Sequence, residues 1–152
     1  MLRGGSPSLI PMPNVRWLIA WITAAHRFVY RVTGGWVGHR ALRLRFLLLG
    51  CSGRKTGREY VVPLLYIPDG ARFVVVGSNA GDPREPAWWT NLKAKPEGWV
   101  QAGRARVAVR AREASREEAE KLWPRLLEAY RWYQDYRERA GRTIPLVLLE
   151  RA

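Results

Sequence analysis

Residues 46–63, with the sequence FLLLGCSGRKTGREYVVP, constrain the fold most, because they encode two strands and the turn that joins them. Residues 46–49 are continuously apolar, which is typical of a short strand buried on both faces. Residues 60–62 are aromatic and β-branched, so extended structure resumes there. Gly53 and Gly57 permit the backbone angles that a tight turn needs. The sequence therefore predicts a β-hairpin.

The turn of this hairpin is strongly cationic. Its cations are Arg54, Lys55 and Arg58, and Ser52 and Thr56 add hydroxyls. A turn of this kind gathers backbone amides into an anion-binding concavity, so the pattern indicates a phosphate site. A solvated hairpin tip and a contact to a nucleic-acid backbone are alternatives that the turn alone leaves open. The turn is not a Walker A loop, because no glycine directly precedes Lys55 and a strand follows.

Length and charge narrow the classes of protein. A chain of 152 residues is expected to form one domain with a real core. Its 26 basic residues against 13 acidic ones give a net charge of +13, which favours anionic partners. The single cysteine forbids an internal disulfide, and with only two histidines the sequence predicts no metal site. These features are consistent with a reducing cytoplasm.

The N-terminal region divides into two parts ahead of the main domain, which we expect at residues 36–152. Residues 1–13 contain glycine, serine and proline and are expected to form a loose arm. Residues 14–35 read as an amphipathic helix whose tryptophans and arginines suit an anionic membrane surface. Its apolar run is shorter than the about 20 residues that span a bilayer. We therefore expect peripheral contact with the cytoplasmic membrane face, or packing on the domain or a partner subunit.

The remaining chain predicts a mainly β or α+β domain. Residues 64–67 are expected to continue the second strand, and further strands are expected at residues 73–77, 99–102, 104–112 and 144–149. With the first hairpin this gives about six strands, mostly joined as antiparallel hairpins, with N-terminal, middle and late helices. Hairpins with segregated helices indicate a barrel-like or α+β architecture.

Helix signals mark the middle and late helices. Pro86 starts a short helix that Pro96 ends. Ser115 and Glu118 form a capping box at the start of a later helix. Pro124 is expected to kink or interrupt that later helix.

Several motifs in order resemble a known family. They are LLLGCSGRKTGREYVVPLLYIPDGARFVVVGSNAGDPREPAWWTNLKAKP, then LWPRLLEAY, YQDY and RTIPLVLLE. Across residues 44–150 this order resembles the deazaflavin-dependent nitroreductase family of small oxidoreductases that bind reduced coenzyme F420. The resemblance implies a split β-barrel related to FMN-binding oxidoreductases, with F420 rather than FMN as the cofactor. It also implies hydride transfer to an electron-poor acceptor such as a quinone, an enone or a nitro compound.

The resemblance also implies which residues form the site. Those expected to bind the cofactor are Arg54, Lys55, Thr56, Gly57, Arg58, Pro63, Leu64, Tyr66, Ser78, Gly81 and Asn91. Those expected to border the substrate are Ser78, Tyr130, Tyr133 and Tyr136. Tyr133 is the best candidate for a hydroxyl that orients or protonates substrate, with Ser78 as a second candidate. From the residues alone, tyrosines at this spacing are also typical of a packed helix face.

The chain departs from the family pattern beside the short helix. Glu85 stands where a histidine often precedes the proline, Trp89 stands where tyrosine is usual, and Thr90 stands where histidine is common. Cys51 replaces a threonine often seen before the turn. We expect these changes to alter substrate preference and to leave phosphate binding intact.

Two other functions remain open from the sequence. One is a basic module that binds nucleic-acid phosphates, which the net charge supports without a recognisable nucleic-acid fold signature. The other is a protein of the same fold that carries the cofactor without turnover. A homodimer is a further expected assembly.

Overall fold

The computed structural model describes Arg27 and residues 44–152. The predicted arm at residues 1–13, and all of the predicted helix at 14–35 except Arg27, lie outside the described residues, so the division of the chain into three parts stays a prediction. Arg27 is helical, and its Nη1 donates to the Val61 carbonyl at 2.8 Å. Within the described residues, no helix combines the length and apolarity needed to cross a bilayer. Peripheral membrane contact through residues 14–35 also stays a prediction.

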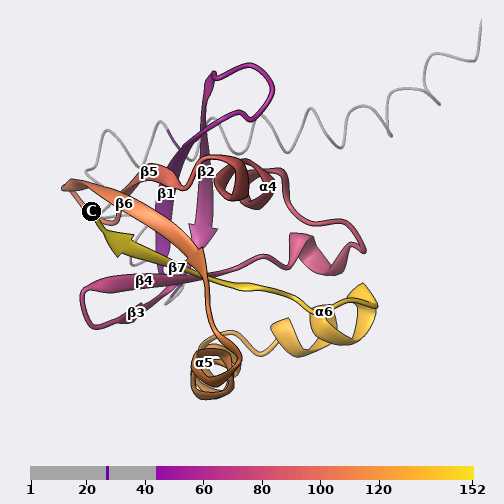
Figure 1. Ribbon diagram of the computed structural model, residues 1–152. Coiled ribbons are helices and arrows are strands. Elements are labelled where there is room, and N and C mark those ends of the chain that lie inside the picture. The colour runs from indigo at the N-terminus through magenta and orange to yellow at the C-terminus, as the bar shows by residue number, and fades with distance from the viewer. Residues whose placement is uncertain (1–26, 28–43) are drawn as a thin grey trace, which may run out of the picture.

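Seven antiparallel strands form one curled sheet (Figure 1). They are β1 (Phe46–Ser52), β2 (Glu59–Leu65), β3 (Ile67–Asp69), β4 (Arg72–Val76), β5 (Glu97–Gln101), β6 (Arg106–Glu113) and β7 (Leu146–Arg151). Their order across the sheet is β2-β1-β5-β6-β7-β4-β3. The sequence predicted about six strands because it extended the second strand through Ile67, whereas β2 ends at Leu65 and β3 begins at Ile67.

The predicted central hairpin is confirmed. β1 pairs with β2 from Phe46 opposite Leu65 to Ser52 opposite Glu59. β1 is buried on both faces, as its apolar run predicts, and Leu47, Leu48 and Leu49 have no exposed surface. β5 pairs with the other side of β1, so β1 lies inside the sheet and β2 lies at its edge.

Within residues 44–152, three helices and one short 3-10 helix accompany the sheet. They are η2 (Asn79–Gly81), α4 (Ala87–Ala94), α5 (Arg116–Ala129) and α6 (Tyr133–Ala140). The predicted capping box is confirmed, because Glu118 N donates to Ser115 Oγ at 3.2 Å and Ser115 N donates to Glu118 Oε1 at 2.9 Å. Of the predicted kink or interruption at Pro124, the interruption is wrong, since α5 runs through this residue, and the kink stays a prediction. Leu122 and Leu126 are buried on either side, and this packing holds the helix together.

The two faces of the sheet bury two separate clusters of side chains. Alternate residues of the central strands divide between them: Val75 and Val147 join the cluster beneath α4, while Val74 and Leu148 join the cluster beneath α5 and α6. This alternation follows from the period of two in a β-strand. Figure 1 shows α5 at the bottom of the view, and η2 between α4 and α6 on the right. Residues 77–84, which we call the segment after β4, therefore lie beside both α4 and α6.

Candidate functional site

Two cavities lie along β2 and α4. The first, of about 310 Å³, is the cationic cavity; its lining residues are Gly53, Arg54, Lys55, Thr56, Tyr60, Val62, Ala87, Trp88 and Asn91. The second, of about 550 Å³, is the apolar cavity; its lining residues are Phe46, Val62, Pro63, Leu64, Leu65, Val76, Ser78, Asn79, Ala80, Pro86, Ala87, Trp88 and Tyr133. Val62, Ala87 and Trp88 line both cavities. The two cavities therefore share one wall and form adjoining parts of one site.

The turn at the cationic cavity is closed by its own backbone. Gly53 N donates to Arg58 O at 2.7 Å, and Gly57 N donates to Gly53 O at 2.8 Å. Arg58 N donates to Thr56 Oγ1 at 3.2 Å. With Arg54 N also donating within the protein, four amides of the turn are occupied. The predicted concavity of free amides is therefore not formed by these four groups, and side-chain cations provide the charge.

Asn91 fixes one of those cations. Its Oδ1 accepts from Arg54 N at 3.1 Å and from Arg54 Nη1 at 3.0 Å, so the guanidinium is held beside the cavity. Asn91 is buried in α4 and also hydrogen-bonds the Cys51 thiol, whose pKa is raised by burial and lowered in part by this bond. The side chain predicted to lie near the cofactor thus connects the turn, β1 and α4.

The cations of the turn are not equivalent. Arg54 and Lys55 line the cationic cavity, with Thr56 beside them. Gly57 and Arg58 are exposed and line neither cavity. The structure thus brings together only part of the predicted anion site.

Two of the residues that line the apolar cavity carry hydroxyls without a partner in the described part of the chain. Tyr133 is 6% exposed and Ser78 is 7% exposed, and both line the cavity from opposite elements, α6 and the segment after β4. Neither hydroxyl has a hydrogen-bond partner among the described residues, and neither is sealed from solvent. Burial, with smaller effects of Tyr130 and Tyr136, raises the pKa of Tyr133, so this phenol keeps its proton at neutral pH. Both hydroxyls are available as donors.

Tyr130 and Tyr66 lie elsewhere. The Tyr130 hydroxyl donates to the Tyr66 carbonyl at 2.9 Å and accepts from Arg45 N at 3.2 Å. Burial raises the pKa of Tyr130, so this hydroxyl also stays protonated. The Tyr66 ring packs edge-on against Phe73 with centroids 5.6 Å apart. Neither residue lines the cationic or the apolar cavity, and their contacts tie β3 and the residues before β1 to the start of α6.

Gly81 and Tyr136 support the segment after β4 from beneath. A Cβ at Gly81 would lie 3.3 Å from Tyr136 Cα, so the glycine allows α6 to approach the segment closely. Gly81 also has φ of 83°, a conformation that glycine adopts readily. Gly81 of the segment and Tyr136 of α6 line neither cavity, while Pro63 and Leu64 of β2 line the apolar cavity.

Residues that depart from the family pattern point away from both cavities. Glu85 pairs with Lys93 on the surface. The Thr90 hydroxyl donates to the Pro86 carbonyl at 3.3 Å. Trp89 is buried in the core, and its Nε1 has no partner. None of the three lines the cationic or the apolar cavity, so an effect on substrate preference would have to act through the position of α4.

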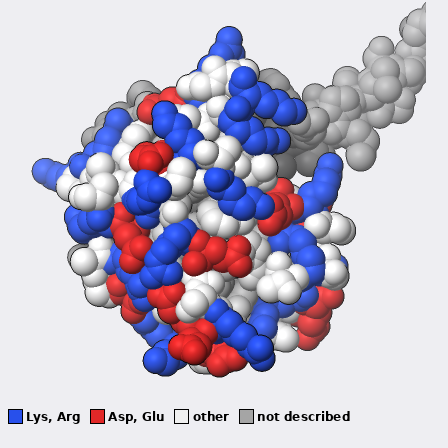
Figure 2. Space-filling model, viewed as in Figure 1, with Lys and Arg blue, Asp and Glu red and all other residues white. Residues whose placement is uncertain are grey.

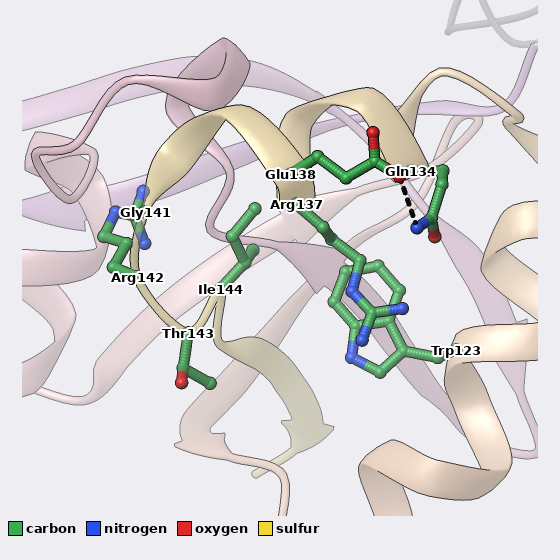
Figure 3. Close-up of a pocket in the computed structure, with 8 residues that line it drawn as sticks. All are labelled: Trp123, Gln134, Arg137, Glu138, Gly141, Arg142, Thr143 and Ile144. Atoms are coloured by element: carbon green, nitrogen blue, oxygen red, sulfur yellow. Dashed lines mark hydrogen bonds between the residues drawn. The ribbon is translucent and has the colours of Figure 1, made fainter.

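A third cavity lies on the other side of α6. Its volume is about 570 Å³, and Arg137 stacks on Trp123 within it at 4.3 Å from the ring. Figure 3 shows Arg142 on the opposite side of the end of α6 from this stacked pair. Arg142 instead reaches the segment after β4, where it donates to four backbone carbonyls. Sequence analysis missed Arg142, because its partners lie 58 to 65 residues earlier and leave no local signal.

The charged surface is mixed. In Figure 2 acidic side chains are interspersed among basic ones over the lower half of the face shown. Part of this mixture is a network in which Arg72 and Arg112 contact Glu118 at 3.1 and 2.7 Å, and Arg112 contacts Glu150 at 2.7 Å. These contacts lower the pKa of Glu118 and raise that of Arg112. Paired arginines of this kind offer less to a nucleic-acid backbone than the net charge suggests.

Comparisons with known proteins agree on one family. The model of the F420H(2)-dependent quinone reductase family matches residues 22–151. An F420H(2)-dependent quinone reductase of Mycobacterium tuberculosis is 37% identical over 131 residues, which cover 83% of this chain and 87% of that protein.

Two solved structures support the same relationship. An F420-H2 dependent reductase (FDR-A) superposes with a TM-score of 0.64 at 35% identity, covering 69% of this chain and 93% of that one. A domain-swapped dimer superposes with a TM-score of 0.67 at 30% identity, covering 87% of this chain and 98% of that one. The curled sheet with its helices is thus the split-barrel fold that the sequence predicted.

Proposed function

This chain belongs to the F420H(2)-dependent quinone reductase family, and we propose that it reduces quinones at the site formed by the cationic and apolar cavities. Membership makes the protein an F420-dependent oxidoreductase with coenzyme F420 as its cofactor. The observation that carries the proposal is the shared wall of Val62, Ala87 and Trp88 between a cationic and an apolar cavity.

The chain's own residues fit such a coenzyme. Arg54 and Lys55 would bind its phosphate and acidic tail, because Asn91 holds the Arg54 guanidinium at the cavity. Pro63 and Leu64 would contact its flat ring system, since they line the adjoining apolar cavity. When bound in reduced form, the coenzyme supplies a hydride.

Tyr133 and Ser78 would assist the acceptor. Reduction of a quinone by hydride leaves negative charge on an oxygen, and a donor that is already oriented stabilises that charge. The Tyr133 phenol is protonated, and its free hydroxyl faces the apolar cavity. Ser78 offers a second hydroxyl from the opposite side. We assign proton donation or hydrogen bonding to Tyr133 first and to Ser78 second, and we assign Tyr130 and Tyr136 to packing.

The lining of the apolar cavity defines an acceptor class wider than quinones. Every side chain on its wall is uncharged, and most are apolar. Such a wall favours neutral, flat molecules, because burying a charge without a partner is costly. We therefore extend the proposal to enones and nitro compounds, which are also neutral and electron-poor.

Replacing Tyr133 by phenylalanine tests the catalytic assignment. Tyr133→Phe keeps the ring and its packing but removes the hydroxyl, so turnover should fall by about 10²–10³ with coenzyme affinity unchanged. Tyr136→Phe is the matched control, because its ring packs on Tyr133 but lines neither cavity. Steady-state reduction of a quinone and an enone, beside a coenzyme titration, measures both. Full activity of Tyr133→Phe on both acceptors would remove Tyr133 from the mechanism.

A ligand titration distinguishes an F420-dependent enzyme from the two alternative functions, a nucleic-acid-binding module and a coenzyme carrier. Purified protein would be titrated with F420, FMN and single-stranded DNA at matched salt. We expect binding of F420 that is at least tenfold tighter than that of FMN, and that weakens with salt because the cations are exposed. Tighter binding of DNA would contradict the assignment. Binding of F420 without any turnover would favour a carrier of the coenzyme.

Self-association is a separate part of the proposal. A structural relative at 30% identity is a domain-swapped dimer, and β2 presents an unpaired edge of the sheet in the described residues. An exposed strand edge is a common pairing surface between copies. Light scattering of the purified chain should give twice the mass of one copy. A single-copy mass at all concentrations would contradict this expectation.

A further inference from the structure

The segment after β4 has an unusual backbone. Asn79, Ala80 and Gly81 follow one another with φ of 47°, 55° and 83°. Glycine adopts this left-handed region freely, and asparagine tolerates it, but alanine has no side-chain group to compensate. Three consecutive left-handed residues are not a regular element. The segment's own hydrogen bonds, such as Gly81 N to Ser78 O at 2.9 Å, are therefore supplemented by contacts from outside it.

Arg142 supplies those contacts. It lies between α6 and β7, and Figure 3 shows its side chain directed away from Trp123 and Arg137. Its hydrogen bonds run from Nη2 to Gly77 O at 3.1 Å, Ser78 O at 3.3 Å and Arg84 O at 3.2 Å, and from Nε to Asp82 O at 3.3 Å. One guanidinium therefore joins both ends of the segment.

The surroundings of Arg142 are not those expected of an arginine that serves only to stabilise the fold. Arg142 is partly buried, and no carboxylate of the described residues lies within ion-pair distance of it, although Asp82 interacts with its charge at longer range. Its Nη1 is buried and has no hydrogen-bond partner. A buried donor without a partner destabilises a fold, and a buried cation is best stabilised by an anion. What this arrangement does provide is a fixed geometry for the carbonyls that it contacts.

The segment that Arg142 holds forms part of the apolar cavity. Ser78, Asn79 and Ala80 line that cavity, and Ser78 contributes one of its two free hydroxyls. We propose that Arg142 is a positioning residue, which holds residues 77–84, including the left-handed Asn79, Ala80 and Gly81, and so aims the Ser78 hydroxyl and the adjoining wall at the acceptor. This inference rests on the proposed function, because the wall it shapes is the acceptor site.

The proposal predicts different effects on the acceptor and on the coenzyme when Arg142 is lost. Arg54 and Lys55 lie in the cationic cavity, which residues 77–84 do not line. Loss of Arg142 should therefore impair quinone kinetics more than coenzyme binding, because the anionic end of the coenzyme binds at Arg54 and Lys55 and only its ring would lie beside residues 77–84. It should raise KM for the quinone or lower kcat by tenfold or more, since misplacing a positioning group by about 1 Å can cost that much.

Hydrogen exchange of the coenzyme-free protein gives a readout independent of activity. The amides of Gly81, Asp82 and Arg84 donate within the segment, so their exchange reports its order. Arg142→Ala should speed exchange in residues 77–84 at least tenfold and leave the turn at 53–58 unchanged. Arg142→Lys keeps the positive charge but loses the planar guanidinium donors, so its exchange rate should lie between those of the parent and Arg142→Ala. Arg137→Ala is the matched control and should alter neither region.

Two rescues distinguish positioning from a general structural role. Added guanidinium ion, at concentrations well below denaturing ones, should restore slow exchange and quinone turnover to Arg142→Ala. Ala80→Gly in the same background should restore part of both, because glycine adopts the left-handed region without strain. A residue needed only for global stability would not respond to a substitution confined to the segment.

Each outcome decides the inference. Unchanged exchange of residues 77–84 in Arg142→Ala would overturn it, and so would faster exchange with normal quinone kinetics. Faster exchange across the whole protein in both Arg142→Ala and Arg142→Lys would also overturn the inference, since Arg142 would then support the whole fold. A parent protein that fails to reduce quinones with reduced F420 would instead contradict the proposed function, and the exchange data alone would decide whether Arg142 holds the segment.

Discussion

The turn at residues 53–58 and the segment at residues 77–84 contribute to the two ends of one site, yet they are held in different ways. The turn places its left-handed φ of 72° at Gly57, where a Cβ would meet nothing within 4 Å, and its own backbone closes it. The segment places a left-handed φ at Ala80 and depends on Arg142, about 60 residues away. The first conformation is encoded locally, and the second is imposed by the tertiary structure.

The largest expected effect is on stability. Gly81→Ala should destabilise the fold by about 2 kcal/mol or more, since it combines left-handed strain with crowding against the Tyr136 backbone. Gly57→Ala, with similar φ but open surroundings, should cost about 1 kcal/mol. Urea denaturation of both variants measures the difference. Equal losses would mean that the segment is no more constrained than the turn.

The next effect concerns binding at the turn. Lys55→Ala should raise the dissociation constant of F420 about tenfold, because a charge-assisted hydrogen bond contributes about 1.5–3 kcal/mol. Arg104→Ala is the matched control, since it removes a cation beside the left-handed Gly103 but lines neither cavity. A fluorescence titration at two salt concentrations measures both. If Lys55→Ala binds like the parent, the turn is only a solvated hairpin tip.

A smaller expected effect is a gain in stability from a substitution in the segment at residues 77–84. Ala80→Gly in the parent protein should stabilise the fold by about 0.5–1 kcal/mol, because glycine removes the left-handed strain. The midpoint of thermal unfolding should then shift upward by about 1–4 °C for a protein of this size. A lower melting temperature would show that the segment is not strained at Ala80.

The smallest effect is a pH dependence at the surface of the segment. The Arg84 side chain and backbone amide donate to the Asp82 carboxylate and lower the pKa of this group. A lowered folded-state pKa stabilises the fold above the ordinary aspartate value of about 3.9, and this contribution is lost as pH falls through the lowered value. An NMR titration of the Asp82 carboxyl measures it. A midpoint at or above the ordinary value would contradict these contacts.

Features that depend on neighbours in sequence could be predicted. The hairpin at β1 and β2 follows from its apolar run and glycines, and Pro86 and Pro96 bound α4 as expected. The capping box at Ser115 has both of its hydrogen bonds. In each case the residues that decide the conformation lie within a few positions of one another.

Features that depend on packing could not be predicted in the same way. The tyrosines at positions 130, 133 and 136 read as one group, but only Tyr133 lines the apolar cavity, because α6 begins there and turns its neighbours elsewhere. Pro124 was expected to kink or interrupt a helix that buried leucines hold together. Arg142 begins the motif RTIPLVLLE but was assigned no role, since a single arginine before a strand predicts nothing about carbonyls in a distant loop.

If the proposed function holds, the wall that Val62, Ala87 and Trp88 share links the two cavities as binding sites. A ligand with an anionic end and a flat end can occupy both cavities only if the linker between its ends passes Trp88. Once one end is bound, the other is held at a high effective concentration beside its own cavity, and its binding becomes intramolecular. Affinity then depends on the length and stiffness of the connecting chain, and a ligand cut into its two halves should bind far more weakly than the intact molecule.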